Sequence, residues 1–162
     1  LKDLLSQSGA AHFIVLERLQ DPGNLGTILR AGEAAGITGV IMDSQTADIY
    51  NPKVIRSTMG AVFRVPFVYV EDLKAALLQL KDHGVHLYAA HLKGQNSYDQ
   101  EDYTESTGFL IGNEAQGLSD EIASLADTYV KIPMAGSVES LNAAIASSVL
   151  MFEVARQRRN QK

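Results

Sequence analysis

The stretch that decides the fold is HFIVLERLQDPGNLGTILRAGEAAGITGVIM, residues 12–42. The apolar run His12–Leu16 predicts a buried strand, and Gly39–Met42 predicts the next one. Between the two runs, Asp21 and Pro22 mark the start of a helix, because Asp is a preferred N-cap and Pro suits the first turn. Apolar residues then recur at helical spacing. A strand, a helix and a strand in this order predict a parallel βαβ unit.

The same alternation continues along the rest of the chain. Further strands are predicted at Phe67–Val70, Val85–Ala90, Gly108–Gly112 and Tyr129–Ile132. Further helices are predicted from Asn51 to about Met59, over Glu71–His83, over Gly117–Ala126 with Ser119 as its cap, and from about Glu139 to Gln157. The last helix is expected to bury the stripe Leu141, Ile145, Val149 and Phe152. The pattern predicts an α/β fold, with a mostly parallel sheet and helices on both faces.

The composition is that of a globular protein. The chain has 162 residues, 46% apolar and 20% charged, which excludes a disordered chain, a collagen and a coiled coil. There is no cysteine, which excludes a disulfide scaffold and a Cys nucleophile and leads us to expect a cytoplasmic location. No run of 18 apolar residues occurs, so no membrane-spanning segment is predicted. Residues 1–11 are interpreted as a linker remnant and residues 12–162 as one domain. Because Leu1 stands where a start Met would be, the chain is hypothesised to be a fragment.

Common signatures of other site types are missing. There is no G-x-G-x-x-G after a strand, no P-loop and no G-x-S-x-G elbow. His83, His86 and His91 are close in sequence, but no nearby carboxylate completes a zinc ligand set, so no metal site is predicted.

Three segments carry residues with potential functional roles. In Asp21–Arg30, two early glycines each cost about 1 kcal/mol relative to Ala in a helix interior, which indicates either a ligand near the backbone or a close helix–helix contact with a solvated Arg. Leu110–Leu118 places Glu114 just after a strand, where ligands bind in open α/β sheets, although an exposed loop has the same pattern. Lys131–Asn142 gathers Ser and Asn at a helix start, for anion binding or for ordinary capping.

Together these segments resemble the three motifs of the SpoU (TrmH-like) branch of the SPOUT RNA methyltransferases. The matching stretches are NLGTILRAGEAAG from Asn24, LIGNEAQGL from Leu110 and IPMAGSVESLNAAIA from Ile132. Their order and spacing fit that family, and the resemblance covers residues 12–156. Three motifs in order are far more specific than any one of them.

The resemblance implies an α/β fold with a trefoil knot near the C-terminus, bound S-adenosylmethionine, a homodimer, and methyl transfer to a ribose 2′-hydroxyl of tRNA or rRNA. The family's cofactor-binding positions correspond to Gly112, Ile132, Met134, Ser140 and Leu141. Its catalytic positions correspond to Asn24, Arg30, Glu114 and Asn142. The resemblance further implies that a small N-terminal RNA-binding domain is missing from this chain.

Mechanistically, the ribose hydroxyl is the difficult partner because it is barely ionised at neutral pH. The family assigns its activation to the residue at Arg30. Since a guanidinium stays protonated, we interpret Arg30 as an electrostatic stabiliser rather than a base. Glu114 is interpreted as a proton acceptor or as the partner that fixes Arg30. Positive charge gathers at two places, Lys53, Arg56 and Arg64, and Arg156, Arg158, Arg159 and Lys162. These residues either contact RNA or form a solvated helix and a basic tail, and the second interpretation is favoured for the tail.

Three other interpretations stay open at this stage. A base-modifying SPOUT enzyme has the same fold, although Asn24, Gly26 and Arg30 favour the ribose branch. A non-catalytic RNA-binding or dimerisation module belongs to another class, and the intact polar residues disfavour it. A flavodoxin-type nucleotide-binding module is the most distant alternative. The net charge of −5 disfavours RNA binding only weakly, because charge can cluster locally.

Overall fold

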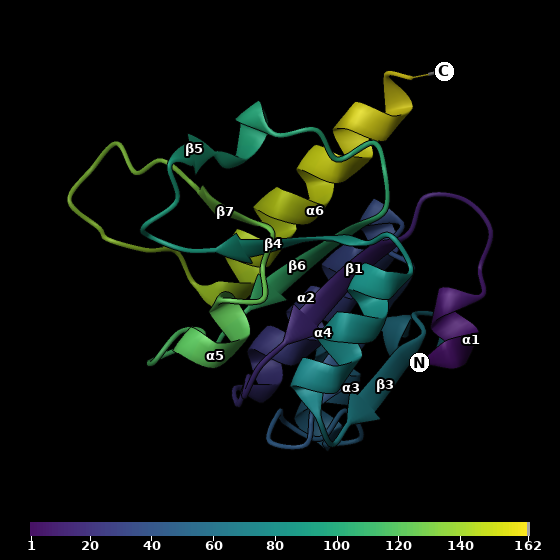
Figure 1. Cartoon of the computed structure of the whole chain (residues 1–162). Coiled ribbons are helices and arrows are strands. Elements are labelled where there is room, and N and C mark those ends of the chain that lie inside the picture. The colour runs from purple at the N-terminus through teal and green to yellow at the C-terminus, as the bar shows by residue number, and fades with distance from the viewer. Residues whose placement is uncertain (162) are drawn as a thin grey trace.

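The computed structural model describes residues 1–161, which form one seven-stranded sheet between two layers of helices (Figure 1). The strands are β1 His12–Leu16, β2 Gly39–Asp43, β3 Phe67–Val70, β4 His86–Ala90, β5 Asn96–Ser97, β6 Thr107–Ile111 and β7 Thr128–Lys131. Their order is β3-β2-β1-β6-β4-β7-β5, and every neighbouring pair is parallel. The predicted α/β class is therefore confirmed, while the knot implied by the resemblance stays a prediction.

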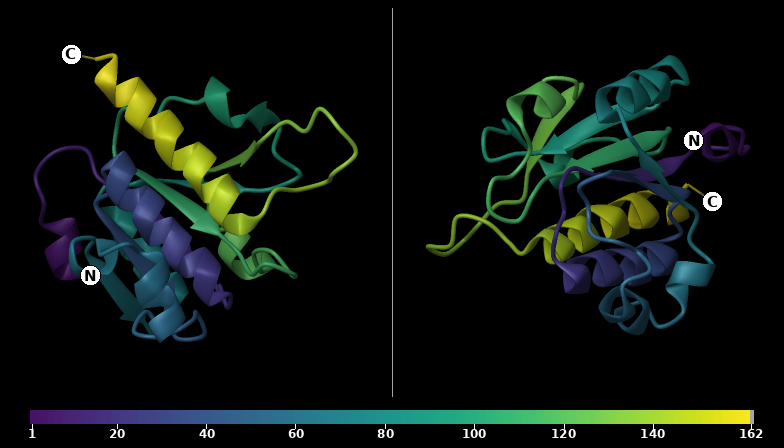
Figure 2. Two further views of the ribbon diagram at one scale, coloured as in Figure 1. Left: turned by 180° about the vertical axis from the view of Figure 1, so that it is seen from behind. Right: turned by 90° about the horizontal axis from the view of Figure 1, so that it is seen from below.

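The helices divide between the two faces of the sheet (Figure 2). They are α1 Lys2–Leu5, α2 Pro22–Ala35, α3 Pro52–Ser57, α4 Leu73–Asp82, α5 Asp120–Ala123 and α6 Ala143–Arg159, with 3-10 turns η1 Ala61–Phe63 and η2 Tyr98–Gln100. Helices α2, α3 and α6 pack on one face, where Ile14 and Leu16 of β1 are buried. Helices α1, α4 and α5 cover the other face, where Phe13 and Val15 are buried. Because β1 is apolar on both sides, it can occupy the centre of the sheet.

The helix starts follow the predicted capping residues. Asp21 accepts the backbone N–H of Asn24 at the start of α2, and Ser119 accepts that of Ile122 at the start of α5. Each cap satisfies an N–H that the helix itself leaves free.

The last helix differs from its prediction in two respects. It begins at Ala143, with Asn142 as N-cap, so residues 139–141 belong to a loop. The predicted buried stripe is wrong, because Ile145 and Phe152 are exposed. The face toward the core instead carries Ala144, Ser147, Leu150, Met151 and Val154. Small residues let α6 approach α2 closely, so backbone proximity decides the buried face more than side-chain size.

Residues 1–11 contain a short helix rather than only extended chain. In α1, Leu4 is buried against the second face of the sheet, and its side chain lies beneath Gly39 of β2. The interpretation of this segment as a linker remnant stays a prediction.

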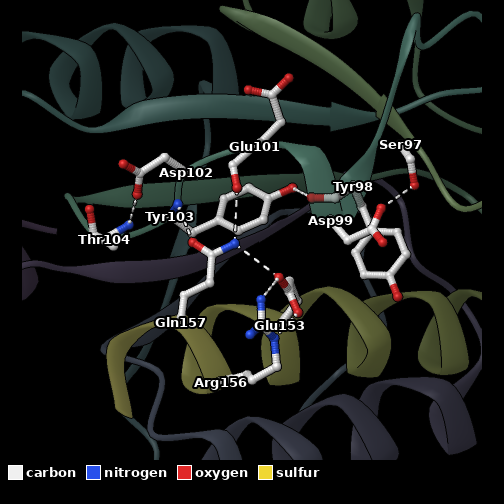
Figure 3. A network of polar contacts seen from close by, with 10 residues as sticks. All are labelled: Ser97, Tyr98, Asp99, Glu101, Asp102, Tyr103, Thr104, Glu153, Arg156 and Gln157. Carbon is white, nitrogen blue, oxygen red and sulfur yellow. Dashed lines mark hydrogen bonds and ion pairs between the residues drawn. The ribbon is translucent and has the colours of Figure 1, made fainter. Parts of the chain in front are cut away.

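The C-terminal half of α6 is bonded to the segment between β5 and β6 (Figure 3). Gln157 accepts the N–H of Tyr103 at 2.8 Å and donates to the carbonyl of Glu101 at 2.9 Å. One turn earlier, Glu153 forms a two-bond pair with Arg156. These contacts fix the path of the polar stretch that leads into β6.

Arg158 joins the same end of α6 to the amino edge of the sheet. Its guanidinium donates to the carbonyls of Ala10, Ala11, Tyr103 and Glu105, at 2.9 to 3.1 Å. His12 is buried nearby with its Nε2 atom unpaired. Burial, reinforced by the charge of Arg158, lowers the pKa of His12 to about 3, so this ring is neutral at physiological pH.

Two kinds of feature are absent from residues 1–161. None of their helices has both the length and the apolar character needed to cross a membrane. Nor do these residues bring together three or more His, Asp or Glu side chains placed to hold a metal ion. The ring of His86 instead bonds the Thr128 hydroxyl, and His91 stacks on Tyr129.

Candidate active site

The loops that follow β4, β6 and β7 line a solvent-open cavity of about 390 Å³ together with the start of α6. Because the sheet is parallel, the carboxyl ends of these strands meet at one edge, where ligands bind in open α/β folds. The five residues predicted to bind a cofactor all line this cavity: Gly112, Ile132, Met134, Ser140 and Leu141. Residues from two separate motifs are thus brought to one site.

Gly112 occupies a position that no side chain can fill. A Cβ atom there would lie 2.2 Å from the carbonyl carbon of Gly117, because the loop after β6 folds back on itself. Asn113 and Gly117 form an antiparallel bridge across this loop, and Gly117 has a φ of +69°. The two glycines therefore allow the tight loop that forms one wall of the cavity.

Asn113 holds this loop against the end of β1. Its Oδ1 accepts the N–H groups of Ala115 and Gln116, and its Nδ2 donates to the carbonyl of Arg18 at 2.8 Å. Our sequence analysis did not single out Asn113. Its position between the glycine and Glu114 of the same motif is the signal that would have identified it.

A chain of hydrogen bonds joins the three sequence motifs. Asn142 Nδ2 donates to Asn24 Oδ1 at 3.0 Å, and Asn24 Nδ2 donates to Glu114 Oε1 at 3.4 Å. At one end, Asn142 Oδ1 accepts the N–H groups of Ala144 and Ile145 at the start of α6. Three of the four predicted catalytic residues are therefore in direct contact.

At the other end of this chain, Glu114 accepts the backbone N–H groups of Gln20 and Asp21, at 2.8 to 3.1 Å. Partial burial acts to raise the pKa of Glu114, but these N–H donors and the Asn24 amide outweigh it, so its pKa lies below the usual value. A carboxylate in this environment is a poor proton acceptor. Its position favours a role in orienting Asn24 and the start of α2.

Arg30 lies apart from these residues. It is exposed on the outer face of α2, does not line the cavity, and has no hydrogen bond or ion pair with any of residues 1–161. The expected contact between Glu114 and Arg30 is therefore not formed within the described chain. The nearest acidic residue on the same helix, Glu33, is paired with Arg64 of the neighbouring segment.

Gly26 has the packing role that we considered for the glycines of the first motif. A Cβ atom there would lie 1.6 Å from Ser57 Oγ, so Gly26 permits α3 to pack against α2. Gly23, in contrast, is exposed, and a Cβ atom there would contact only the Asp21 side chain.

The cavity is also lined by residues that the sequence analysis did not assign to the site. Further lining residues are His91 and Leu92 after β4, Lys131 at the end of β7, and Glu139 before α6. The first two come directly after a parallel strand, which is the position that could have indicated them. The sheet and the cavity together define a ligand-binding α/β domain whose site lies at the carboxyl edge of a parallel sheet.

Comparison with known proteins identifies which such domain this is. The family model described as the SpoU rRNA Methylase family matches residues 11–152. A TrmH family relative from Staphylococcus aureus is 35% identical over 158 residues, which are 98% of this chain and 64% of the relative. This chain belongs to the SpoU rRNA methylase family.

Solved structures agree with this assignment. The SpoU methyltransferase AviRb from Streptomyces viridochromogenes superposes with a TM-score of 0.92 at 34% identity, covering 100% of this chain and 65% of AviRb. AviRb in complex with the cofactor AdoMet superposes with a TM-score of 0.90 at 34% identity, covering 97% of this chain and 61% of that one. The present chain thus spans less than two thirds of the length of these relatives.

Proposed function

We propose that this chain is the catalytic domain of an RNA methyltransferase, which uses S-adenosylmethionine to methylate a ribose 2′-hydroxyl of tRNA or rRNA. The observation that carries the proposal is that residues from the second and third motifs line one cavity, while Asn24 joins the first motif to both. The AdoMet complex of AviRb, whose fold this chain shares, supports the choice of cofactor.

The residues of the cavity fit this cofactor. Its volume of about 390 Å³ lies within the range of small-molecule sites, roughly 300 to 1,000 Å³. Ile132 and Leu141 offer apolar surface for an adenine ring, and Ser140 and Glu139 offer polar groups for the amino acid end. When bound, the cofactor supplies a methyl group on a sulfonium, which is a good leaving group.

The remaining task of the protein is to activate the ribose oxygen. As the methyl group is transferred, the ribose hydroxyl loses its proton to solvent water, and the positively charged guanidinium of Arg30 stabilises the negative charge that develops on this oxygen and orients the neighbouring phosphate. Glu114 is a positioning residue in this scheme, because its oxygens are already bonded to backbone N–H groups. Asn24 bonds Glu114, and Asn142 bonds Asn24, so these hydrogen bonds hold the start of α6 at a fixed place relative to Glu114.

We further propose that two copies of the chain pair through the face formed by α2 and α6. Ile145 and Phe152 are exposed on α6, which packs beside α2. Arg30 is exposed on α2 but does not line the cavity of its own subunit. A second copy seated on this face would cover the apolar side chains and bring Arg30 close to a cavity.

Arg30→Ala tests the catalytic proposal. We expect the rate of methyl transfer to fall by roughly 100- to 1,000-fold, the loss typical of removing one charge-stabilising donor. Calorimetric affinity for S-adenosylmethionine should stay within a few-fold of wild type, because Arg30 does not line the cavity. The matched control is Lys2→Ala, which removes a positive charge from α1 on the opposite face of the sheet. Near-normal transfer by the Arg30 variant would remove this residue from the mechanism.

The target atom needs its own measurement. The full-length protein would be incubated with labelled cofactor and total RNA from a knockout strain, and the product digested in alkali. A methylated 2′-oxygen blocks cleavage of the adjacent phosphodiester, whereas a methylated base does not. Alkali-sensitive product would support the base-modifying alternative, and absence of both cofactor binding and transfer would support the non-catalytic one.

Phe152→Asp tests the pairing proposal. We expect the mass measured by light scattering to fall from that of two chains to that of one, because a charge would replace an apolar contact. Leu78→Asp, at an exposed apolar position of α4 on the opposite face, is the control and should leave the mass unchanged. A wild-type chain that is already monomeric would contradict the proposal.

A further inference from the structure

Several of the basic residues that the sequence analysis named for RNA contacts are bonded within the protein. Arg156 is paired with Glu153, and Arg64 with Glu33. Arg158 is bonded to backbone carbonyls at the amino edge of the sheet. None of these three guanidinium groups is free for a phosphate without breaking an internal contact. Arg159 is exposed and in no ion pair among residues 1–161, but it is a single cation at the end of α6. Lys162 lies outside the described residues.

Lys53 and Arg56 differ from these residues. Both are exposed on α3, and neither forms an ion pair with any carboxylate among residues 1–161. Residues 49–70 include three basic residues and no acidic one, in a chain whose net charge is −5. The surface around α3 is therefore a local exception to the acidic character of the protein, and an anionic partner would complement it.

Exposed apolar side chains lie within the same segment. Phe63 is 82% exposed, Met59 67% and Tyr50 66%. RNA-binding proteins use exposed aromatic rings to stack unpaired bases, beside cations that contact the phosphates. Residues 49–70 carry three basic residues and no acidic one, and Lys53 is of the residue type depleted in the cores of protein interfaces, so we choose RNA as the partner and leave a protein partner as an outcome of the test.

The backbone of this segment is fastened to α2. The guanidinium of Arg64 bonds both Glu33 of α2 and the carbonyl of Met59, across the turn that joins α3 to η1. Ser57 packs into the space that Gly26 leaves on α2. The exposed side chains are thus presented from a fixed position beside the helix that carries Arg30.

We propose that the α3–η1 surface, defined by Tyr50, Lys53, Arg56, Met59 and Phe63, binds single-stranded RNA next to the nucleotide to be methylated. Tyr50 and Phe63 stack on bases, and Lys53 and Arg56 contact phosphates. This inference rests on the proposed function, because it gives that function a place for the substrate strand.

The test measures binding of a fluorescein-labelled single-stranded RNA of mixed sequence, 12 nucleotides long, to the whole chain at several salt concentrations. Lys53→Ala/Arg56→Ala should weaken binding, and the slope of log affinity against log salt should fall by about 1.4, the value for two phosphate contacts to a single strand. Phe63→Ala should weaken binding roughly tenfold, as loss of one stacked base does, with an unchanged salt slope.

Matched controls lie on the opposite face of the sheet. Lys2→Ala/Lys74→Ala removes the same charge from α1 and α4, and Leu78→Ala removes an exposed apolar side chain from α4. Both should bind the RNA like wild type. Far-ultraviolet circular dichroism and calorimetric binding of S-adenosylmethionine would verify that each variant is folded.

Three results would overturn the inference. The first is that the α3 variants bind the RNA like the controls, and the second is that the wild-type chain does not bind it. The third is that Phe63→Ala changes the mass of the particle but not its RNA affinity, which would make the surface a protein interface. Failure of the proposed function would instead appear as a wild-type chain that neither binds S-adenosylmethionine nor transfers methyl groups, whatever its RNA affinity.

Discussion

The two edges of the sheet carry polar side chains that serve opposite purposes. At the amino edge, Arg158 is bonded to the carbonyls that precede β1 and β6, and His12 is buried and neutral. At the carboxyl edge, Glu114, Asn24 and Asn142 form a chain beside a cavity that is open to solvent. The same strands run between both edges.

The difference lies in where the polar groups find their partners. At the amino edge, the guanidinium of Arg158 bonds backbone carbonyls. These bonds contribute stability, and they leave few free donors for a ligand. The carboxyl edge uses its hydrogen bonds to hold loops around a space, so stability there depends on backbone approach at positions such as Gly112. Substitutions at the two edges should therefore have separable effects on folding and on binding.

The largest effect is expected at Gly112. In Gly112→Ala the new methyl group would lie 2.2 Å from the backbone of Gly117, so the loop must move. We expect an unfolding free energy at least about 3 kcal/mol lower in urea titrations, together with loss of cofactor binding. Gly136→Ala is the control, because a Cβ there meets no atom within 4 Å. Equal behaviour of the two variants would contradict the tight wall that we describe.

Arg158→Met should cost somewhat less, about 2 to 3 kcal/mol, because it removes four charge-assisted hydrogen bonds to backbone carbonyls, two of them partly buried, while keeping part of the apolar packing. Urea denaturation measures this loss, and Arg159→Met, at the neighbouring exposed position, should change little. Calorimetric affinity for S-adenosylmethionine should be unchanged in the folded variant. A large fall in that affinity would show that the two edges are coupled.

The smallest effect concerns the pH dependence of stability. Burial lowers the pKa of His12 from 6.5 to about 3, so between these pH values the ring is protonated in the unfolded chain and neutral in the folded chain. Above pH 6.5 the ring is neutral in both states and does not change the free energy of unfolding. That free energy falls as the pH drops from 6.5 toward 3. At pH 5 the loss is about 2 kcal/mol, taking 1.36 kcal/mol for each unit.

His12→Phe is the variant that isolates this contribution. It keeps a ring against Phe109 and removes the titrating group. Its unfolding free energy should therefore decline less between pH 7 and pH 5 than that of wild type. Parallel profiles for the two proteins would mean that His12 is solvated.

Local signals predicted most of the fold. Strand positions followed from short apolar runs, and helix starts followed from Asp21 and Ser119, because both features act over a few residues. The buried face of α6 could not be predicted in that way. Its apolar residues occur on two sides, and only the packing against α2 selects the side with Ala144 and Ser147.

The sequence likewise predicted one part of the candidate site and not another. The resemblance to the SpoU family implied the cofactor positions that line the cavity, whereas the hydrogen bonds among Asn24, Glu114 and Asn142 were not predicted, because they join segments far apart in the sequence. The isolation of Arg30 from Glu114 was not predicted either, since it depends on the direction in which α2 presents each side chain. Arg158 was expected in a basic tail, yet the fold bonds it to carbonyls far away in sequence.

The central place of β6 has a consequence for biosynthesis. His12 of β1 pairs with Thr107 of β6, so this edge of β1 stays unpaired until most of the chain has been translated. At 5 to 20 residues per second that delay is roughly 5–20 s. During this time an apolar strand edge is available to other nascent chains. We therefore expect the newborn polypeptide to need chaperone protection until β6 inserts, although the finished protein is compact.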